Sequence, residues 1–193
     1  ESYTRFLVLG RTVDDAAGEA FDKVVRTLGL GYPGGPAVAK AALGGSETAH
    51  PLPTPHVEGA YNVSFSGLKT AVLNAVNRAR QAGEEVDVPG MAASFQWRIT
   101  EILAEKLLAA ARDTGAARIC IAGGVGANEA LRRKVQQGAR ALGAQVFLPQ
   151  LSLCGDNAAM VAAQGYYEFL AGHTAHSNLN GLPTLGIDDE SLD

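Results

Sequence analysis

The sequence predicts an α/β protein in which helices are layered against a segment of parallel β-sheet. Strand-like and helix-like patterns alternate along the second half of the chain, as they do in βαβ units. Residues 118–122 form an apolar run bounded by glycines, as expected for a strand that is covered on both faces. Hydrophobic residues make up 47% of the chain and charged residues 19%, which supplies a packed core and argues against global disorder.

The first half of the chain predicts one strand, one helix and two irregular segments. Residues 3–10 are rich in aromatic and β-branched residues and stop at a glycine, so we expect a strand there. Apolar residues recur at helical spacing over residues 21–28, which predicts an amphipathic helix that ends at Gly29. Glycines and prolines crowd residues 29–36, which predicts a shaped loop, and residues 41–61 have the composition of an irregular connection.

The second half predicts four helices and two further strands. Ser64 or Ser66 is expected to cap the first of these helices, which runs to about Gln81, and Pro89 suits the first turn of a long helix that runs towards Gly115. The remaining expected elements are a strand over residues 118–122, a helix over 128–142, a strand over 145–148 and a helix over 156–170. Three strands are fewer than the ~5 to 6 of a typical sheet, so we expect an incomplete sheet.

The charge balance and the two cysteines limit the classes of function. Sixteen basic and 20 acidic residues give a net charge of -4, which argues against a protein that coats nucleic acid by bulk electrostatics. Cys120 and Cys154 form no paired-thiol motif, so we expect neither a disulfide framework nor a thiolate metal site, and a cytoplasmic location fits. No stretch approaches the ~18 unbroken apolar residues of a membrane span, so no membrane association is expected.

Three carboxylates recur in the first predicted helix. Asp15, Glu19 and Asp22 are spaced so that a helix would stack them on one face. Such a row is either a solvated acidic face near the positive end of the helix dipole or a row that receives ligand hydroxyls or a cation. The small residues 16–18 would let a ligand approach the backbone closely.

Glycine makes up 23 of the 193 residues, well above the usual ~7%, and two glycine clusters indicate ligand contacts. In residues 29–36, two prolines fix φ while Gly34 and Gly35 permit positive φ, which would give a rigid loop with accessible amides. Gly123 and Gly124 lie between a predicted strand and a helix N-terminus, where free amides favour a nucleotide. No Gly-Lys-Ser/Thr follows, so this is not a Walker loop, and either cluster could instead be a structural turn.

Two single side chains, Asp156 and Lys69, are further candidates for binding a ligand or a metal ion. Asp156 is either the N-cap of the last helix or a carboxylate that projects from the end of a strand into a cleft, as metal or phosphate sites require. Lys69 lies in the first turn of a helix, against the dipole, which indicates an anionic partner unless the side chain is simply exposed.

Five motifs occur in a fixed order and together are highly specific. They are residues 14–23, 29–36, 64–70, 122–128 and 154–160. From the first residues to about Tyr167, the chain resembles the TsaD family, the tRNA adenosine threonylcarbamoyltransferases. The resemblance implies an actin-like ATPase fold, related to ribonuclease H, with two α/β lobes and a nucleotide-like ligand and a metal ion in the cleft between them.

The resemblance also implies an activity. The family transfers the threonylcarbamoyl group of threonylcarbamoyl-adenylate to the adenosine beside the anticodon, in tRNAs that read codons beginning with A. Its ligand-binding positions match Asp22, Gly35 and Asn128, and its metal-binding carboxylate matches Asp156, the metal being iron or zinc. In this assignment Asp22 binds ribose hydroxyls, the glycines lie under the adenine, and catalysis is positioning plus charge stabilisation.

The chain departs from the family pattern in three ways. Ala39 stands where the family usually has Asp, and Gly155 stands where it has Thr or Ser. The family's first lobe and its paired metal histidines have no counterpart here. We therefore expect residues 1–172 to be most of the second lobe, residues 173–193 to be an extension, and the chain alone to be inactive.

Other classes of function and several partners remain open. A small-molecule kinase or carbamoyltransferase of the actin superfamily would bind ATP or ADP through the same loop, and a non-catalytic assembly module would bind a nucleotide without turnover. Arg132, Arg133, Lys134 and Arg140 are the best candidates for a tRNA-binding patch, unless they are a solvated helix face. By resemblance, the protein partners are TsaB-like and TsaE-like proteins.

Overall fold

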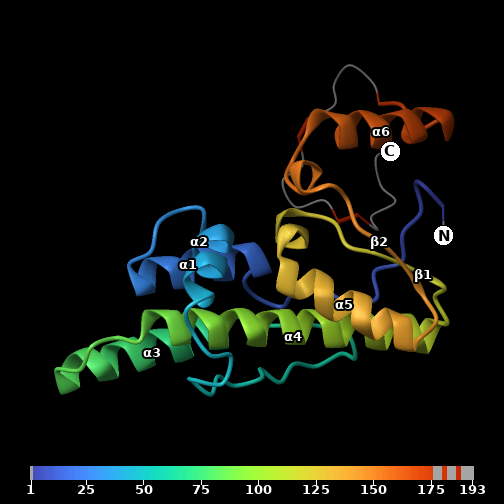
Figure 1. Cartoon of the computed structure of the whole chain (residues 1–193). Helices are drawn as coiled ribbons and strands as arrows, with labels where there is room; N and C mark the ends of the chain where they lie inside the picture. The colour runs from blue at the N-terminus through green and yellow to red at the C-terminus, as the bar shows by residue number, and fades with distance from the viewer. Residues whose placement is uncertain (1, 176–179, 182–185, 188–193) are drawn as a thin grey trace. The chain divides into compact units, whose positions relative to one another are not determined.

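The computed structural model describes residues 2–175, 180–181 and 186–187 of the chain, and this part is mainly helical with one small parallel sheet. Figure 1 shows the elements. In order they are α1 (Ala17–Leu28), α2 (Gly34–Ala42), α3 (Ser66–Ala82), α4 (Val88–Thr114), β1 (Arg118–Cys120), the 3-10 turn η1 (Gly124–Ala127), α5 (Glu129–Ala141), β2 (Gln145–Phe147), the 3-10 turn η2 (Leu151–Leu153) and α6 (Ala158–Leu170). None of the helices described is long and apolar enough to cross a bilayer.

The chain divides into two compact units. The larger unit is Gly10–Cys154, and it contains everything from α1 to η2. The smaller unit combines the described residues of Glu1–Leu9 with those of Gly155–Asp193, and it contains α6. The predicted boundary at residue 172 remains a prediction.

The larger unit is organised around α4, whose 27 residues give it a length of about 40 Å. Helices α2 and α5 pack against α4, and α1 packs against α2 and α3 (Figure 1). Asp87 caps α4 by accepting a hydrogen bond from the Gly90 amide, Pro89 occupies the first turn, and Gly115 ends the helix at φ 66°. The long helix predicted from Pro89 towards Gly115 is therefore confirmed.

Two hydrophobic clusters hold the larger unit together. The first joins α1, α2, α3 and the first half of α4, with Phe21 and Phe95 meeting edge to face at 5.2 Å between ring centres. The second joins the later part of α4 to the sheet and α5, through residues that include Ile119 and Val135. Because α4 contributes to both clusters, it fixes the α1–α2 pair and the sheet relative to the same rigid helix.

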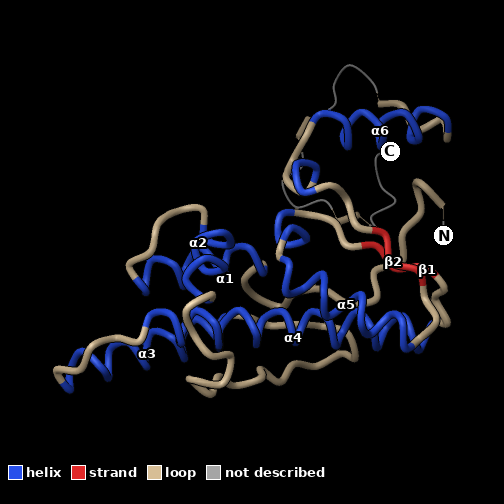
Figure 2. The backbone as a smooth tube through the Cα atoms, in the orientation of Figure 1, coloured by secondary structure: helices blue, strands red, loops and turns tan. Residues whose placement is uncertain are grey.

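Within the described residues, the sheet consists of β1 and β2 (Figure 2). The two strands pair in parallel, with Ile119 opposite Val146. Both strands were predicted, as was an incomplete sheet. The prediction that residues 118–122 are covered on both faces is wrong, since Ile119 is buried but Arg118 and Cys120 are exposed. Within the larger unit, helices α4 and α5 pack against the buried side of the sheet.

The strand predicted over residues 3–10 is also wrong, since no residue described in that segment belongs to a strand. A strand pairs its backbone with a second strand, and the ladders of the described chain do not include residues 3–10. The nearest strand-like pairing is a single parallel bridge between Thr12 and Val63. Within the smaller unit, the segment is fixed instead by Tyr3, whose ring stacks on that of Tyr167 at 3.9 Å.

The segment predicted as a shaped loop begins as a loop and becomes a helix. Helix α2 begins at Gly34, and Pro33 occupies its N-cap position, so Gly34 and Gly35 are helical and neither has positive φ. Proline is tolerated in the first turn, where amides lack helical partners, and the alanine-rich residues 37–42 then favour helix. Within residues 29–36, only Gly29, which ends α1 at φ 70°, uses the left-handed region.

Helix α3 has its cap in another segment of the chain. The prediction that Ser64 or Ser66 caps this helix is wrong. Phe65 occupies the N-cap position, and neither serine caps the helix through its own side chain. The Asp14 carboxylate instead accepts hydrogen bonds from the amides of Phe65 and Ser66, at 2.8 and 3.3 Å, and from the hydroxyls of both serines. Although partial burial opposes ionisation, these hydrogen bonds hold the pKa of Asp14 well below its usual value.

Candidate functional site

The larger unit contains a pocket of about 790 Å³, within the ~300–1,000 Å³ range of small-molecule sites. Four parts of the chain that are distant in sequence line it: α1, the start and middle of α2 with the turn before it, one residue of α4, and η1 with the beginning of α5. Among the lining residues are Gly18, Phe21, Asp22, Tyr32, Pro33, Gly35, Pro36, Ala39, Lys40, Gln96, Gly124, Val125, Asn128, Glu129 and Arg133.

The three carboxylates predicted to form one row are separated by the structure. Helix α1 begins at Ala17, so Asp15 precedes it. Lys23 binds both Asp15 and Glu19, at 2.7 and 2.8 Å. Asp22 alone lines the pocket, and its Oδ1 accepts a hydrogen bond from the Gly34 amide at 2.9 Å. Its Oδ2 has no hydrogen-bond partner among the residues described, so this oxygen of Asp22 is available to a ligand.

Gly34 and Gly35 have different roles. A Cβ on Gly34 would lie 2.5 Å from Asp22 Oδ1 and 2.7 Å from the Asp22 nitrogen, so α1 and α2 approach closely only because this residue is glycine. A Cβ on Gly35 would meet nothing within 4 Å, and Gly35 lines the pocket. Gly34 therefore sets the packing of the two helices, whereas Gly35 leaves space in the pocket.

The glycine-rich turn after β1 forms another wall. Gly124 lines the pocket, and a Cβ there would meet no atom within 4 Å. Gly123 does not line the pocket; its φ of 81° turns the chain from the strand into η1. Val125, in the same turn, lies near Gly18 of α1, which brings this turn and the acidic helix to the same pocket.

Asn128 combines a structural bond with a place in the pocket. Its Oδ1 caps α5 by accepting hydrogen bonds from the amides of Ala130 and Leu131, at 3.0 and 3.1 Å. Its Nδ2 donates to Oε1 of Gln96 at 3.0 Å. Gln96 also lines the pocket, but no sequence signal marks it, because it lies inside the regular α4 helix with no motif around it.

Lys69 lies outside the pocket lining, but its predicted anionic partner exists. Its Nζ lies 4.0 Å from Asp15 Oδ2, and this oxygen is buried without a hydrogen bond. Lys69 and Lys23 thus approach the same carboxylate from α3 and α1. This is an ion-pair cluster between two helices.

The four basic residues proposed for tRNA do not share one face, because neighbours on a helix point about 100° apart. Arg132 donates to the carbonyls of Gly126 and Pro149, and Lys134 pairs with Glu101 and lies over the Trp97 ring. Arg133 lines the pocket and Arg140 is exposed. The predicted patch is therefore reduced to Arg140 on the surface and Arg133 at the pocket.

Asp156 belongs to the smaller unit and is exposed. It is not the cap of α6, because Asn157 accepts the hydrogen bond from the Met160 amide. The described residues include no group of three His, Cys, Asp or Glu side chains that could hold a metal ion. A single exposed carboxylate does not make a metal centre, so the described residues do not fit the implied metal by themselves.

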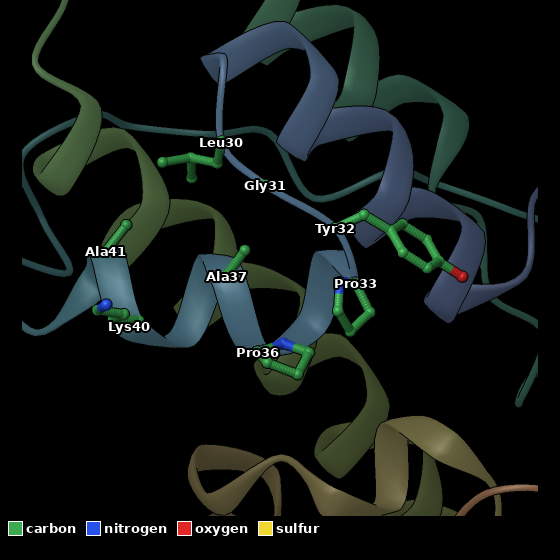
Figure 3. A pocket seen from close by; sticks show the side chains of 8 residues that line it. All are labelled: Leu30, Gly31, Tyr32, Pro33, Pro36, Ala37, Lys40 and Ala41. Atoms are coloured by element: carbon green, nitrogen blue, oxygen red, sulfur yellow. The ribbon is translucent and has the colours of Figure 1, made fainter.

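A smaller groove adjoins the pocket (Figure 3). Its volume is about 570 Å³, and its lining is mainly apolar side chains of α2 and the turn before it, such as Leu30 and Ala41. Tyr32, Pro33, Pro36 and Lys40 line both cavities. Lys40 and Arg133 are the cationic side chains of the larger pocket, so α2 and α5 each contribute one positive charge to its lining.

Fold and pocket together define an α/β protein with a ligand-sized pocket beside a glycine-rich strand-to-helix turn. A model of the TsaD family, described as tRNA N6-adenosine threonylcarbamoyltransferase, matches residues 1–163, and the chain belongs to this family. Proteins named tRNA N6-adenosine threonylcarbamoyltransferase from Symbiobacterium thermophilum and Desulfitobacterium hafniense are 49% and 48% identical to it, over 95% and 97% of this chain. A relative of the same name from Clostridioides difficile is 44% identical over 97% of it.

The chain spans about half the length of these relatives: the alignments cover 53%, 55% and 56% of the three.

Proposed function

We propose that this chain supplies the adenylate-binding half of a tRNA-modifying acyltransferase. The enzyme would move the threonylcarbamoyl group from threonylcarbamoyl-adenylate to the adenosine beside the anticodon of tRNAs that read codons beginning with A. The observation that carries the proposal is the single pocket in which Asp22, Gly35, Gly124 and Asn128 meet. These residues come from three of the motifs that identify the family, and they are distant in sequence.

The chemistry of the pocket supports an adenylate. Asp22 Oδ2 is an acceptor for a ribose hydroxyl, and Gly35 and Gly124 leave room for a flat base. Lys40 and Arg133 suit the phosphate. In the transfer, the adenosine N6 forms a bond to the carbamoyl carbon, the bond from that carbon to the phosphate oxygen breaks, and AMP leaves as N6 loses a proton. Binding groups of this kind contribute positioning rather than covalent catalysis.

The lobe, the metal ligand, the partners and the cellular location of the chain are also proposals. We assign the chain to most of the second lobe of an actin-like fold, with residues after 172 as an extension and with Asp156 as one carboxylate ligand of an iron or zinc ion. tRNA and TsaB-like and TsaE-like proteins are the proposed partners. Cys120 and Cys154 are free thiols, which supports the proposed cytoplasmic location. No step of the transfer is assigned to Asp156.

The chain alone is expected to bind the nucleotide but not to transfer the group. One wall of a site cannot orient a donor and a tRNA acceptor together. The measurement is the incorporation of labelled threonine into tRNA by the purified 193-residue chain with threonylcarbamoyl-adenylate. Incorporation at the rate of a longer family member would contradict this expectation.

Binding of adenosine tests the proposed pocket directly. Titration calorimetry should show that the chain binds adenosine and that Asp22→Asn weakens binding about tenfold or more, since a hydrogen bond to a charged acceptor is worth ~1.5–3 kcal/mol. Asn at this position keeps an oxygen for the Gly34 amide, so the helix packing is retained. A deoxyadenosine that lacks the bound hydroxyl should bind the wild-type chain weakly and show little further loss in Asp22→Asn.

Glu85→Gln is the matched control, because it removes an exposed carboxylate outside the pocket. It should bind adenosine as the wild type does. The proposal fails if adenosine does not bind, or if Asp22→Asn binds as tightly as Glu85→Gln.

A further inference from the structure

The hydrogen bonds of Asn128 and Gln96 fix which atoms these two amides present to the pocket. Oδ1 of Asn128 accepts from two backbone amides at the N-terminus of α5, and only an oxygen can do so. The Asn128 nitrogen must therefore face Gln96. It donates to Gln96 at 3.0 Å, so the Gln96 atom that it meets must be the oxygen.

This chain of bonds leaves the nitrogen of Gln96 free. Oε1 is held by Asn128, and Nε2 makes no hydrogen bond to any other residue described. Nε2 is also absent from the buried polar atoms without partners, which in the described chain are Asp15 Oδ2 and Arg98 Nε. Gln96 lines the pocket, so the accessible Nε2 is a donor at the pocket wall.

The backbone amides at the N-terminus of α5 fix the orientation of the Gln96 side-chain amide, because they fix that of Asn128. A free glutamine amide can rotate to present either its oxygen or its nitrogen to a ligand. Here rotation would bring two N–H groups together at Asn128 and leave Asn128 Nδ2 without an acceptor, which is unfavourable. The wall at Gln96 and Asn128 therefore offers N–H donors, whereas Asp22 offers an acceptor.

We infer that Gln96 is a specificity-determining residue, whose Nε2 donates a hydrogen bond to a ring nitrogen of the bound base. This inference rests on the proposed function, because it takes the pocket to hold adenosine. The ring nitrogens of adenine are acceptors, whereas its exocyclic amine is a donor and would oppose the N–H groups of this wall. Asn128 acts on the base through Gln96, as well as through its own remaining N–H.

Gln96→Glu isolates the proposed bond. The carboxylate keeps an oxygen for Asn128 Nδ2 and has nearly the same shape, but at neutral pH it replaces the donor with an acceptor. Adenosine is the probe, because it carries no phosphate that the new charge would repel. Titration calorimetry should show adenosine binding that is about tenfold weaker or more, with a thermal unfolding midpoint close to that of the wild type.

Base analogues then identify the acceptor. The 1-deaza, 3-deaza and 7-deaza forms of adenosine each replace one ring nitrogen with C–H. One of them should bind the wild-type chain about tenfold more weakly than adenosine and should lose little more in Gln96→Glu, as expected when both changes remove one interaction. Gln136→Glu, the same change at an exposed position of α5, should leave all affinities unchanged.

The outcomes separate this inference from the proposed function. If the wild-type chain does not bind adenosine, both fail. If the wild type binds adenosine but Gln96→Glu binds it equally well, or no deaza analogue is weakened, only the role of Gln96 is overturned.

Discussion

Gly34 and Gly35 are adjacent and identical, yet the structure requires glycine at only one of them. A methyl group on Gly34 would press on Asp22, whereas the same group on Gly35 would point into open space. Gly34→Ala should therefore lower the free energy of unfolding by about 1–3 kcal/mol, as overpacking usually does. Gly35→Ala should leave it unchanged or raise it by about 0.5–1 kcal/mol, since alanine favours helix. Urea denaturation measures both.

Gly35 should matter for adenosine affinity, although it does not matter for stability. Gly35→Ala narrows the pocket and should weaken adenosine binding while the fold is intact. Gly31→Ala is its control, because a Cβ on Gly31 also meets nothing within 4 Å and Gly31 lies outside the larger pocket. A destabilised Gly35→Ala, or a Gly34→Ala as stable as the wild type, would contradict the assignment of the two roles.

Much of the pocket lining could be predicted from the sequence, because characteristic residue types mark those positions. Asp22, Gly35, Gly124 and Asn128 are all marked by glycines, small residues or helix ends, and all line the pocket. Gln96 carried no such mark, because only tertiary packing brings the middle of α4 to the start of α5. Lys69 was chosen for its position in a helix, and its partner proved to be Asp15.

At the scale of elements, α3 depends for its cap on Asp14, which lies 51 and 52 positions before the two capped amides. Asp14 binds the start of the helix in its ionised form, and its pKa is lowered in the folded chain. The stability that it contributes is therefore present above its unfolded pKa of about 3.9 and is lost as the pH falls below that value. Asp14→Asn should lower the free energy of unfolding at pH 7 by about 1 kcal/mol, as loss of a cap does.

The pH dependence distinguishes this cap from a generic packing effect. The difference between the wild type and Asp14→Asn should shrink as the pH is lowered from about 5 to about 3, measured by urea denaturation at each pH. Glu47→Gln, at an exposed position, should show no such convergence. A difference that stays constant with pH would mean that the charge of Asp14 is not what stabilises α3.

Arg132 connects α5 to three other positions in the chain. Its Nε donates to Gly126 at 2.6 Å, and its Nη2 donates to Pro149 at 2.8 Å and approaches Cys154 Sγ at 3.1 Å. Lysine cannot reproduce this forked geometry. Arg132→Lys should lower the thermal unfolding midpoint and speed amide exchange in residues 123–127, whereas Arg133→Lys, at an exposed residue, should do neither. Unchanged exchange would exclude this role.

The elements that the sequence predicted correctly are those that carry their own signals. Helix α4 has a cap, a proline in its first turn and a terminal glycine, so its bounds follow from local chemistry. Residues 3–10 have strand-like composition, but a strand is defined by pairing with a second strand, and the ladders of the described chain do not include these residues. Helix α2 was missed because its first residues are glycines and a proline, which elsewhere end helices.

At the scale of the whole molecule, α6 is apolar but unburied. None of its 13 residues is buried, and Val161 and Phe169 are 65% and 66% exposed. A helix of this composition is usually covered. We expect the purified chain to self-associate as its concentration rises, and Val161→Ser with Phe169→Ser to reduce this association without changing the unfolding midpoint of the larger unit. Sedimentation velocity measures the first effect and calorimetry the second.

The matched control for α6 is a pair of serine substitutions at exposed apolar residues elsewhere, Leu43 and Leu73. If these reduce self-association equally, the effect is general surface hydrophobicity rather than a property of α6.

Through the amide of Asn128, the N-terminus of α5 determines which hydrogen-bonding groups the pocket wall presents. An aspartate at this position would still cap α5, but it would offer Gln96 an oxygen in place of a nitrogen. The glutamine would then turn over and show its own oxygen to the base. A single exchange that preserves the helix would thus invert the wall from donating to accepting, and with it the set of bases that the pocket tolerates.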